Sequence, residues 1–143
     1  MIKDEIEQSI YSKDYDTLRR ILRESPGKVR ILVSRLNITD QIKLEAVLTA
    51  FQIAAMVLNE EKLLDLVRRL MWMLNEESGN NCPAAALALG HIAQVRLDAV
   101  RPHLPVLRLY AEDPSPMMSA TVSRALAMIR NAEIAQQSET ENS

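Results

Sequence analysis

The chain repeats itself at the length of a pair of helices. Segment 67–75 and the small residues after it echo segment 29–37, with matching positions 38 residues apart. A third copy follows at an offset of 37 residues, where Ile129 matches Ile92. Because each copy reads as helix, turn, helix, this period is typical of an α-solenoid, in which stacking buries the faces that a single helix pair leaves open.

Composition points to an all-helical domain. Of the 143 residues 48% are hydrophobic and only three are glycine, and no stretch sustains the apolar–polar alternation of a half-buried strand. A chain of this length suits one domain with its own core. We therefore expect an all-α fold of about eight helices, arranged as a short right-handed α-solenoid of stacked antiparallel helix pairs.

The helix pattern divides the chain into a cap, three repeats and a tail. The domain is expected over residues 1–137, whereas residues 138–143 lack an apolar anchor and are expected to be disordered. Within the domain we expect an N-terminal capping hairpin followed by three repeats, in chain order 1–26, 27–58, 59–95 and 96–135.

Local signals predict two helix starts and one break. Asp40 and Asn59 stand where a side-chain oxygen accepts hydrogen bonds from first-turn amides, so each is expected to cap the helix that follows. Pro102 and Pro105 fall within one apolar stretch. Because proline lacks the amide hydrogen that a helix interior uses, we interpret Pro102 as an early helical residue and Pro105 as a kink or a delayed start.

Charge and segment composition argue against several classes of protein. Seventeen basic and nineteen acidic residues give a net charge of −2, whereas nucleic-acid proteins usually carry a basic excess. The charged N-terminus lacks an apolar signal core, and no apolar run reaches the ~18 residues of a membrane span. Cys82 is the single cysteine, which excludes an internal disulfide and fits a reducing compartment. We expect a cytoplasmic protein without membrane contact.

The third copy resembles the HEAT-type repeat family. Its Asp-Pro turn at 112–114 and the stretch 122–126 match the turn of that family and the Val-Arg-like pair that follows it. Ser123 separates the two members of the pair here, and the other two copies lack the Asp-Pro turn. The resemblance implies a helical-repeat fold.

A second segment narrows the resemblance. Residues 68–79 are similar to a stretch of small bacterial HEAT-like repeat proteins, whose tryptophan is matched by Trp72 and whose Ser-Gly is matched at 78–79. Asn80 stands where that group has a second glycine. The resemblance covers about residues 27–135 and implies an armadillo-type α-solenoid. It implies no activity and no cofactor, because that group has no assigned chemistry.

No residue set indicates catalysis or metal binding. Cys82 and His91 lie nine residues apart, which on one helix places them half a turn out of phase and about 13 Å apart along the axis. Cys82 is therefore expected to be a small packing residue, and His91 to lie between repeats with a hydrogen bond to a carbonyl. We expect a protein that is not an enzyme and that uses neither cofactor nor metal.

Two polar segments are candidate interaction sites, and each has a purely structural alternative. A polar turn would bind a cationic group or a partner's backbone, or would only cap a helix. A basic patch would bind phosphate or an acidic partner, or would only be a solvated face. The residues of the turn are Glu76, Glu77, Asn80 and Asn81. The residues of the patch are Arg19, Arg20, Arg23 and Arg30.

Four large apolar residues bear on packing and self-association. Trp72 lies on an almost wholly apolar helix, so we expect its ring in the core, with a position lining a groove as the alternative. Met117, Met118 and Met128 are candidate apolar edges for contact with a second copy of the chain.

The leading functional hypothesis is a non-catalytic protein–protein interaction or scaffolding module. Stacked hairpins form a concave face from the second helix of each repeat, and Gln52, Gln94 and Arg124 are candidate contacts on it. The expected partner is another protein or peptide, including a second copy. Two alternatives stay open: a nucleic-acid-binding HEAT-like protein of the alkyl-base glycosylase type, and an accessory subunit of a lyase-type enzyme.

Overall fold

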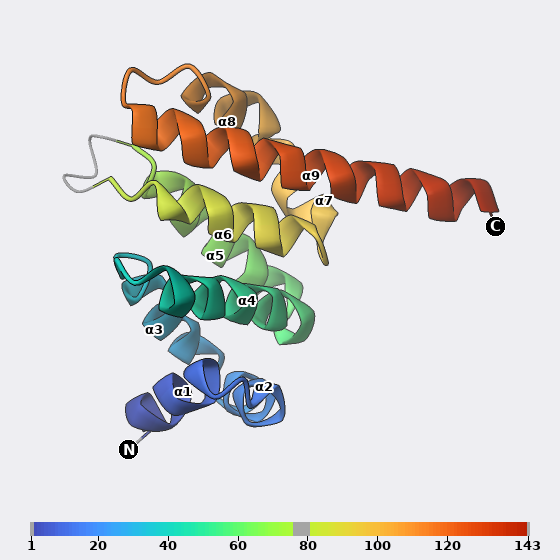
Figure 1. Cartoon of the computed structure of the whole chain (residues 1–143). Helices are drawn as coiled ribbons and strands as arrows, with labels where there is room; N and C mark the ends of the chain where they lie inside the picture. Colours follow the sequence, from blue (N-terminus) through green and yellow to red (C-terminus); the bar gives the residue numbers. More distant parts are fainter. Residues whose placement is uncertain (1, 76–80, 143) are drawn as a thin grey trace.

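The computed structural model describes residues 2–75 and 81–142, and this part of the chain is all-helical, without strands (Figure 1). The prediction of an all-α fold is thereby confirmed. The α-helices are α1 (Ile2–Tyr11), α2 (Tyr15–Glu24), α3 (Val29–Ser34), α4 (Gln41–Val57), α5 (Glu60–Trp72), α6 (Ala84–Ala93), α7 (Leu97–Val100), α8 (Leu104–Tyr110) and α9 (Pro116–Asn142). Two 3-10 turns join them, η1 (Pro26–Lys28) and η3 (Arg101–His103).

Three of the helices run side by side in one row. Figure 1 shows α4, α6 and α9 one above the other, each beginning at the left of the view. α6 lies in the middle of the row, where it packs against α4 and α9 and also against α5 and α7. α1 and α2 close the lower end of the molecule, and α8 packs on α9 at the upper end.

Side-chain caps fix the starts of three helices. The Asp40 carboxylate accepts hydrogen bonds from the amides of Ile42 and Lys43, at 2.9 and 3.1 Å. The Asn59 side chain accepts from the amide of Lys62 at 2.9 Å. Both predicted caps are confirmed, and Asp14 caps α2 in the same way. Each cap satisfies first-turn amides that a helix by itself leaves without partners.

Pro105 lies at a delayed helix start, as predicted, whereas Pro102 lies in a 3-10 turn. α7 ends at Val100, the turn η3 contains Pro102, and Pro105 lies in the first turn of α8. A proline in these positions loses no helical hydrogen bond, because first-turn amides lack intrahelical acceptors. The expected single helix is therefore a short helix, a turn and a delayed second helix.

The C-terminal end differs from the expected disordered tail. α9 continues through Asn142, although residues 138–143 were predicted to be disordered. The segment after Ala132 contains neither glycine nor proline, so no local signal ends the helix. The side chains of residues 134–139 are exposed all the same, so this part of α9 is helical without being packed.

The core consists of aliphatic residues and Phe51, and it is tightest between α6 and α9. Gly90 faces α9 there, and a Cβ at this position would lie 2.9 Å from Met128 Sδ and 3.3 Å from Ala125 Cα. Only a residue without a side chain allows the two helices to approach this closely. The row of parallel helices is therefore held by direct contact rather than by long side chains.

Lys13, between α1 and α2 at the lower end, has a backbone conformation that is unfavourable for a residue with a side chain. α1 ends with the amide of Asp14 donating to the carbonyl of Ser9 at 2.9 Å, the bond that closes a Schellman motif. Lys13, inside this motif, has a φ of 61°. Glycine is the usual residue in the left-handed region, because a Cβ crowds the backbone there.

Candidate functional site

The row of parallel helices carries a continuous surface that contains three of the predicted contact residues. We call it the α4–α6–α9 face. Its described members from the three helices are Gln41, Glu45, Thr49 and Gln52; Ala84, Leu87, His91 and Gln94; and Met117, Thr121 and Arg124. Along each helix these residues recur every three or four positions, so they share one side of it.

A cavity opens at the N-terminal ends of the three helices. It has a volume of about 370 Å³. Leu87 of α6 is buried at 4% exposure and lines it, together with Thr121 and Arg124 of α9. The remaining lining is mostly apolar and comes from the segment before α4, from α4 and from the start of α6. It comprises Leu36, Asn37, Ile38, Thr39, Gln41, Leu44, Cys82, Pro83, Ala84 and Met117.

Cys82 belongs to the frame of this cavity and is not a reactive group. Its side chain is 3% exposed, its amide donates to the carbonyl of Met73 at 2.7 Å, and its Sγ lies 3.9 Å from the carbonyl oxygen of Leu36. Burial raises the pKa of the thiol. A raised pKa disfavours the thiolate, which is the nucleophilic form. The prediction that Cys82 is a packing residue is confirmed.

His91 lies on α6, four residues after Leu87. A charged residue on each neighbouring helix acts on its imidazole. Burial lowers the pKa of its imidazole; Arg124 of α9 lowers it further, and Glu45 of α4 opposes the shift. Within the described part of the chain its buried Nδ1 has no hydrogen-bond partner. The expected hydrogen bond to a carbonyl is therefore not found at that nitrogen. His91 is held neutral by burial instead.

At the C-terminal end of α6 the face joins two predicted residues directly. The Gln52 side-chain amide donates a hydrogen bond to the side-chain oxygen of Gln94, 42 positions later in the chain. This contact links α4 to the end of α6. The structure therefore brings Gln52 and Gln94 together and places Arg124 on the same face, nearer the cavity.

The predicted polar turn falls mostly outside the described residues. Glu76, Glu77 and Asn80 lie in the gap between residues 75 and 81, and Asn81 is exposed at its edge. The proposed role of this turn stays a prediction.

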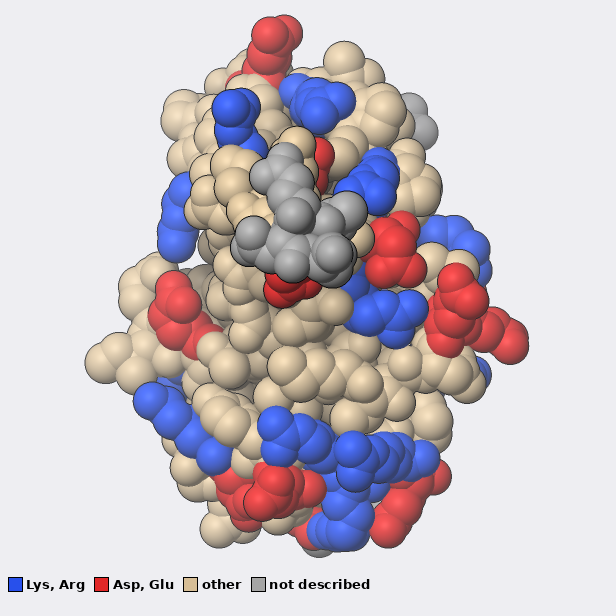
Figure 2. All heavy atoms as spheres, turned by 90° about the vertical axis from the view of Figure 1, so that its right-hand side faces the viewer, with Lys and Arg blue, Asp and Glu red and all other residues tan. Residues whose placement is uncertain are grey.

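The predicted basic patch is divided by ion pairs. Arg19 pairs with Asp16 at 3.0 Å, and Arg20 pairs with Glu5 at 2.6 Å and with Glu24 at 3.5 Å. Figure 2 agrees: basic side chains gather at the lower end of the molecule with acidic side chains among them. Two patch residues, Arg23 and Arg30, are exposed and form no salt bridge within the described chain. Solvent-exposed pairs contribute little to stability, but they reduce the charge available to an anion.

Two predictions about large apolar residues are wrong. Trp72 is 55% exposed, because the buried stripe of α5 ends at Leu70 and a position two residues later points about 200° away from it. Met118 is buried in the core, whereas its neighbour Met117 is 68% exposed. Met128 is partly buried against Gly90. Of the three methionines, only Met117 is available as an apolar edge.

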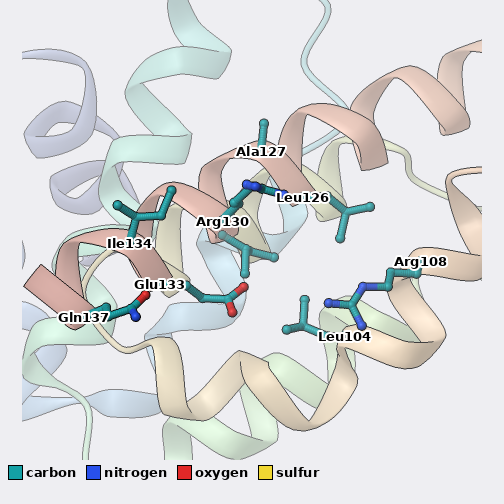
Figure 3. A pocket seen from close by; sticks show the side chains of 9 residues that line it. Leu104, Arg108, Leu126, Ala127, Arg130, Glu133, Ile134 and Gln137 are labelled. Atoms are coloured by element: carbon teal, nitrogen blue, oxygen red, sulfur yellow. The ribbon is translucent and has the colours of Figure 1, made fainter.

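A second cavity, which the sequence did not predict, lies between α8 and α9. Its volume is about 470 Å³. Figure 3 shows the Arg108 guanidinium and the Glu133 carboxylate pointing into the same space, with Leu104 and Leu126 beside them. Arg108 and Glu133 come from different helices, so only their packing brings them together. No periodicity or spacing in the sequence would have indicated this pair.

Neither cavity brings together a metal-binding set of described side chains. In the described part of the chain, no three His, Cys, Asp or Glu side chains lie close enough together to hold a metal ion. None of the described helices has both the length and the apolar character needed to cross a bilayer. Comparison with protein-family models, curated proteins and solved structures gave no match.

Proposed function

We propose that this protein is a non-catalytic interaction module, a short HEAT-like α-solenoid whose α4–α6–α9 face binds a segment of another protein. The observation that carries the proposal is that residues of α4, α9 and the end of α6 meet on one surface. Gln52 and Gln94 are in direct contact, and Arg124 borders the adjacent cavity.

The burial of equivalent positions supports the repeat organisation. Ala50, Ala88 and Ala125 are related by the offsets of 38 and 37 residues, and all three are 0% exposed. Leu32, Leu70 and Leu107 obey the same offsets and are also 0% exposed. Similar positions in similar environments are expected when each helix pair packs on the next.

The chemistry of the face suits a polypeptide better than a small reactive substrate. An apolar cavity accepts a side chain, while the neighbouring amide and guanidinium groups supply directional hydrogen bonds. Burial raises the pKa of the Cys82 thiol, which disfavours the thiolate that a nucleophilic cysteine needs. A binding surface is therefore the interpretation that we favour.

Selection from a random-peptide display library tests the proposal. Thr121→Trp places a large ring in the cavity, whereas Ala120→Trp places the same ring on an exposed neighbour that does not line it. Peptides selected on the unmodified protein should bind Ala120→Trp within about twofold in fluorescence anisotropy and lose about tenfold or more on Thr121→Trp. Circular dichroism establishes that both variants fold.

Two results would overturn the proposal. One is a selection that yields no binding peptide. The other is a set of peptides whose affinity is equal for Thr121→Trp and Ala120→Trp, because such peptides bind elsewhere on the molecule.

A further inference from the structure

We infer that the segment bound by this face is an α-helix that carries a large apolar side chain and, one turn away, a carboxylate directed at Arg124. The inference rests on the proposed function and specifies the chemistry of the partner. It follows from the order of Leu87, His91 and Gln94 along the chain and from the positive charge of Arg124 at the border of the cavity.

The face offers three levels of contact, each about one helical turn from the next. The cavity lies beside Leu87, the imidazole of His91 follows four residues later, and the Gln52–Gln94 pair ends the series at position 94. Seven residues of helix span about 10.5 Å. Glu45 of α4 and Arg124 of α9 both act on the His91 imidazole, so each neighbouring helix contributes a charge near this level.

This spacing fits a helix better than an extended strand. Side chains on one side of a helix recur about every 5.4 Å, so a helix lying along α6 presents a group to all three levels. Same-face side chains of a strand recur about every 6.7 Å, and by the third level they lie about 2.9 Å beyond the matching group on α6. The α4–α6–α9 face is therefore matched by two turns of a partner helix.

The first level selects an apolar side chain. Leu36, Ile38 and Leu44 line one side of the cavity, and Met117 on the opposite side is 68% exposed. Covering these residues with an apolar side chain removes apolar surface from water on both partners. The volume of about 370 Å³ has room for one large side chain of this kind.

A carboxylate is selected between the first and second levels, because Arg124 lines the cavity and also acts on the His91 imidazole. Arg124 is the one charged side chain among the described residues that line the cavity, and it forms no salt bridge within the described part of the chain. Its guanidinium is permanently charged and suited to bidentate carboxylate binding. Glu45 lies on the other side of His91, on α4, so it does not occupy this position.

Two matched charge reversals on α9 test the inference with the same display library. Arg124→Glu changes the charge at the cavity, and Arg130→Glu makes the same change at an exposed residue that lines the α8–α9 cavity instead. Peptides selected on the unmodified protein should share an apolar residue with an acidic residue three or four positions away. Their affinity should fall about tenfold or more on Arg124→Glu and change less than about threefold on Arg130→Glu.

A second selection, on Arg124→Glu itself, should replace the acidic residue of the peptides with a basic one. Circular dichroism of a selected peptide should show added helix on binding. Peptides without an acidic residue at this spacing, equal losses on the two charge reversals, or a bound peptide without helix would each contradict the inference. If such peptides still lose affinity on Thr121→Trp, the proposed function stands and only the partner chemistry is wrong.

Discussion

α6 and the C-terminal part of α9 are both helices, but different forces hold them in place. Every residue of α6 from Ala85 to Gly90 is buried, and the helix touches neighbours on several sides. In contrast, the side chains of residues 134–139 are exposed, although Arg101 donates a hydrogen bond to Gln136 at 3.2 Å. Packing therefore determines stability in the centre of the molecule, whereas local backbone preferences determine it at the C-terminal end of α9.

The largest expected effect comes from removing a buried side chain in the centre. Leu89 of α6 is 0% exposed, so Leu89→Ala should lower the free energy of unfolding by about 2–5 kcal/mol, from lost burial and a residual cavity. Ile134→Ala removes an aliphatic group that is 52% exposed and should cost less than about 0.5 kcal/mol. Urea unfolding measures both. Equal losses would contradict the distinction between centre and end.

The next effect concerns the close contact between α6 and α9. Gly90→Val puts side-chain atoms where even a Cβ would lie 3.3 Å from Ala125 Cα, so we expect a loss of about 1–3 kcal/mol in the free energy of unfolding. Gly27→Val is the control, because a Cβ at Gly27 meets no atom within 4 Å. A Gly90→Val protein as stable as Gly27→Val would show that the two helices separate easily.

At the lower end a substitution should stabilise the protein. Lys13 has a φ of 61°, so Lys13→Gly relieves backbone crowding and should raise the free energy of unfolding by about 0.5–1 kcal/mol. Ser12→Gly adds the same backbone flexibility at the preceding residue without relieving a positive φ. This control should lower the free energy of unfolding slightly. Thermal unfolding of the two variants compares them. A destabilised Lys13→Gly would mean that this end depends on the lysine side chain.

A smaller effect is expected from His91, whose contribution to the stability of the centre depends on pH. The pKa of His91 in the folded protein is lowered by burial, with Arg124 adding to the shift and Glu45 opposing it. The unfolded chain therefore binds the proton more readily. The contribution of neutral His91 to the free energy of unfolding is fully present above the pKa of the unfolded state, about 6.5. It decreases as the pH falls toward the lower pKa of the folded state.

Urea midpoints at pH 7.5 and 5.5 measure this dependence, and His91→Gln provides the comparison. The unmodified protein should lose more stability over this interval than His91→Gln does, since the other titrating groups are common to both. The same loss in the two proteins would show that His91 has similar proton affinity in the folded and unfolded states.

The smallest effect is expected at the C-terminal end. Deleting residues 138–143 removes the end of α9, where the side chains of residues 138 and 139 are exposed. The free energy of unfolding should therefore change by less than about 0.5 kcal/mol. The far-ultraviolet circular dichroism signal should decrease at the same time. A loss as large as that of Gly90→Val would show that this part of α9 is packed.

Predictions from the sequence were reliable where the cause is local. The caps at Asp40 and Asn59 and the break at Pro105 involve hydrogen bonds within a few residues, so the sequence pattern contains all the information they need. The error at Trp72 has a different origin. Its helix is apolar on most sides, so composition alone did not reveal which side faces the solvent.

The candidate site was predictable only in part. Gln52, Gln94 and Arg124 were expected on one surface because the repeat assigns them to equivalent helices, and the structure does place them on the α4–α6–α9 face. The placement of Arg108 and Glu133 at the same cavity was not expected. No repeat or motif relates these two residues.

By itself the sequence determined the all-helical class and the helix starts at Asp40 and Asn59. These properties depend on backbone preferences and on apolar spacing within one segment. Tertiary structure alone decided that Gln52 meets Gln94, that a cavity opens beside Arg124, and that the ring of Trp72 remains in solvent. The physical reason is that such contacts join residues far apart in the chain, and their geometry depends on how the helices pack against one another.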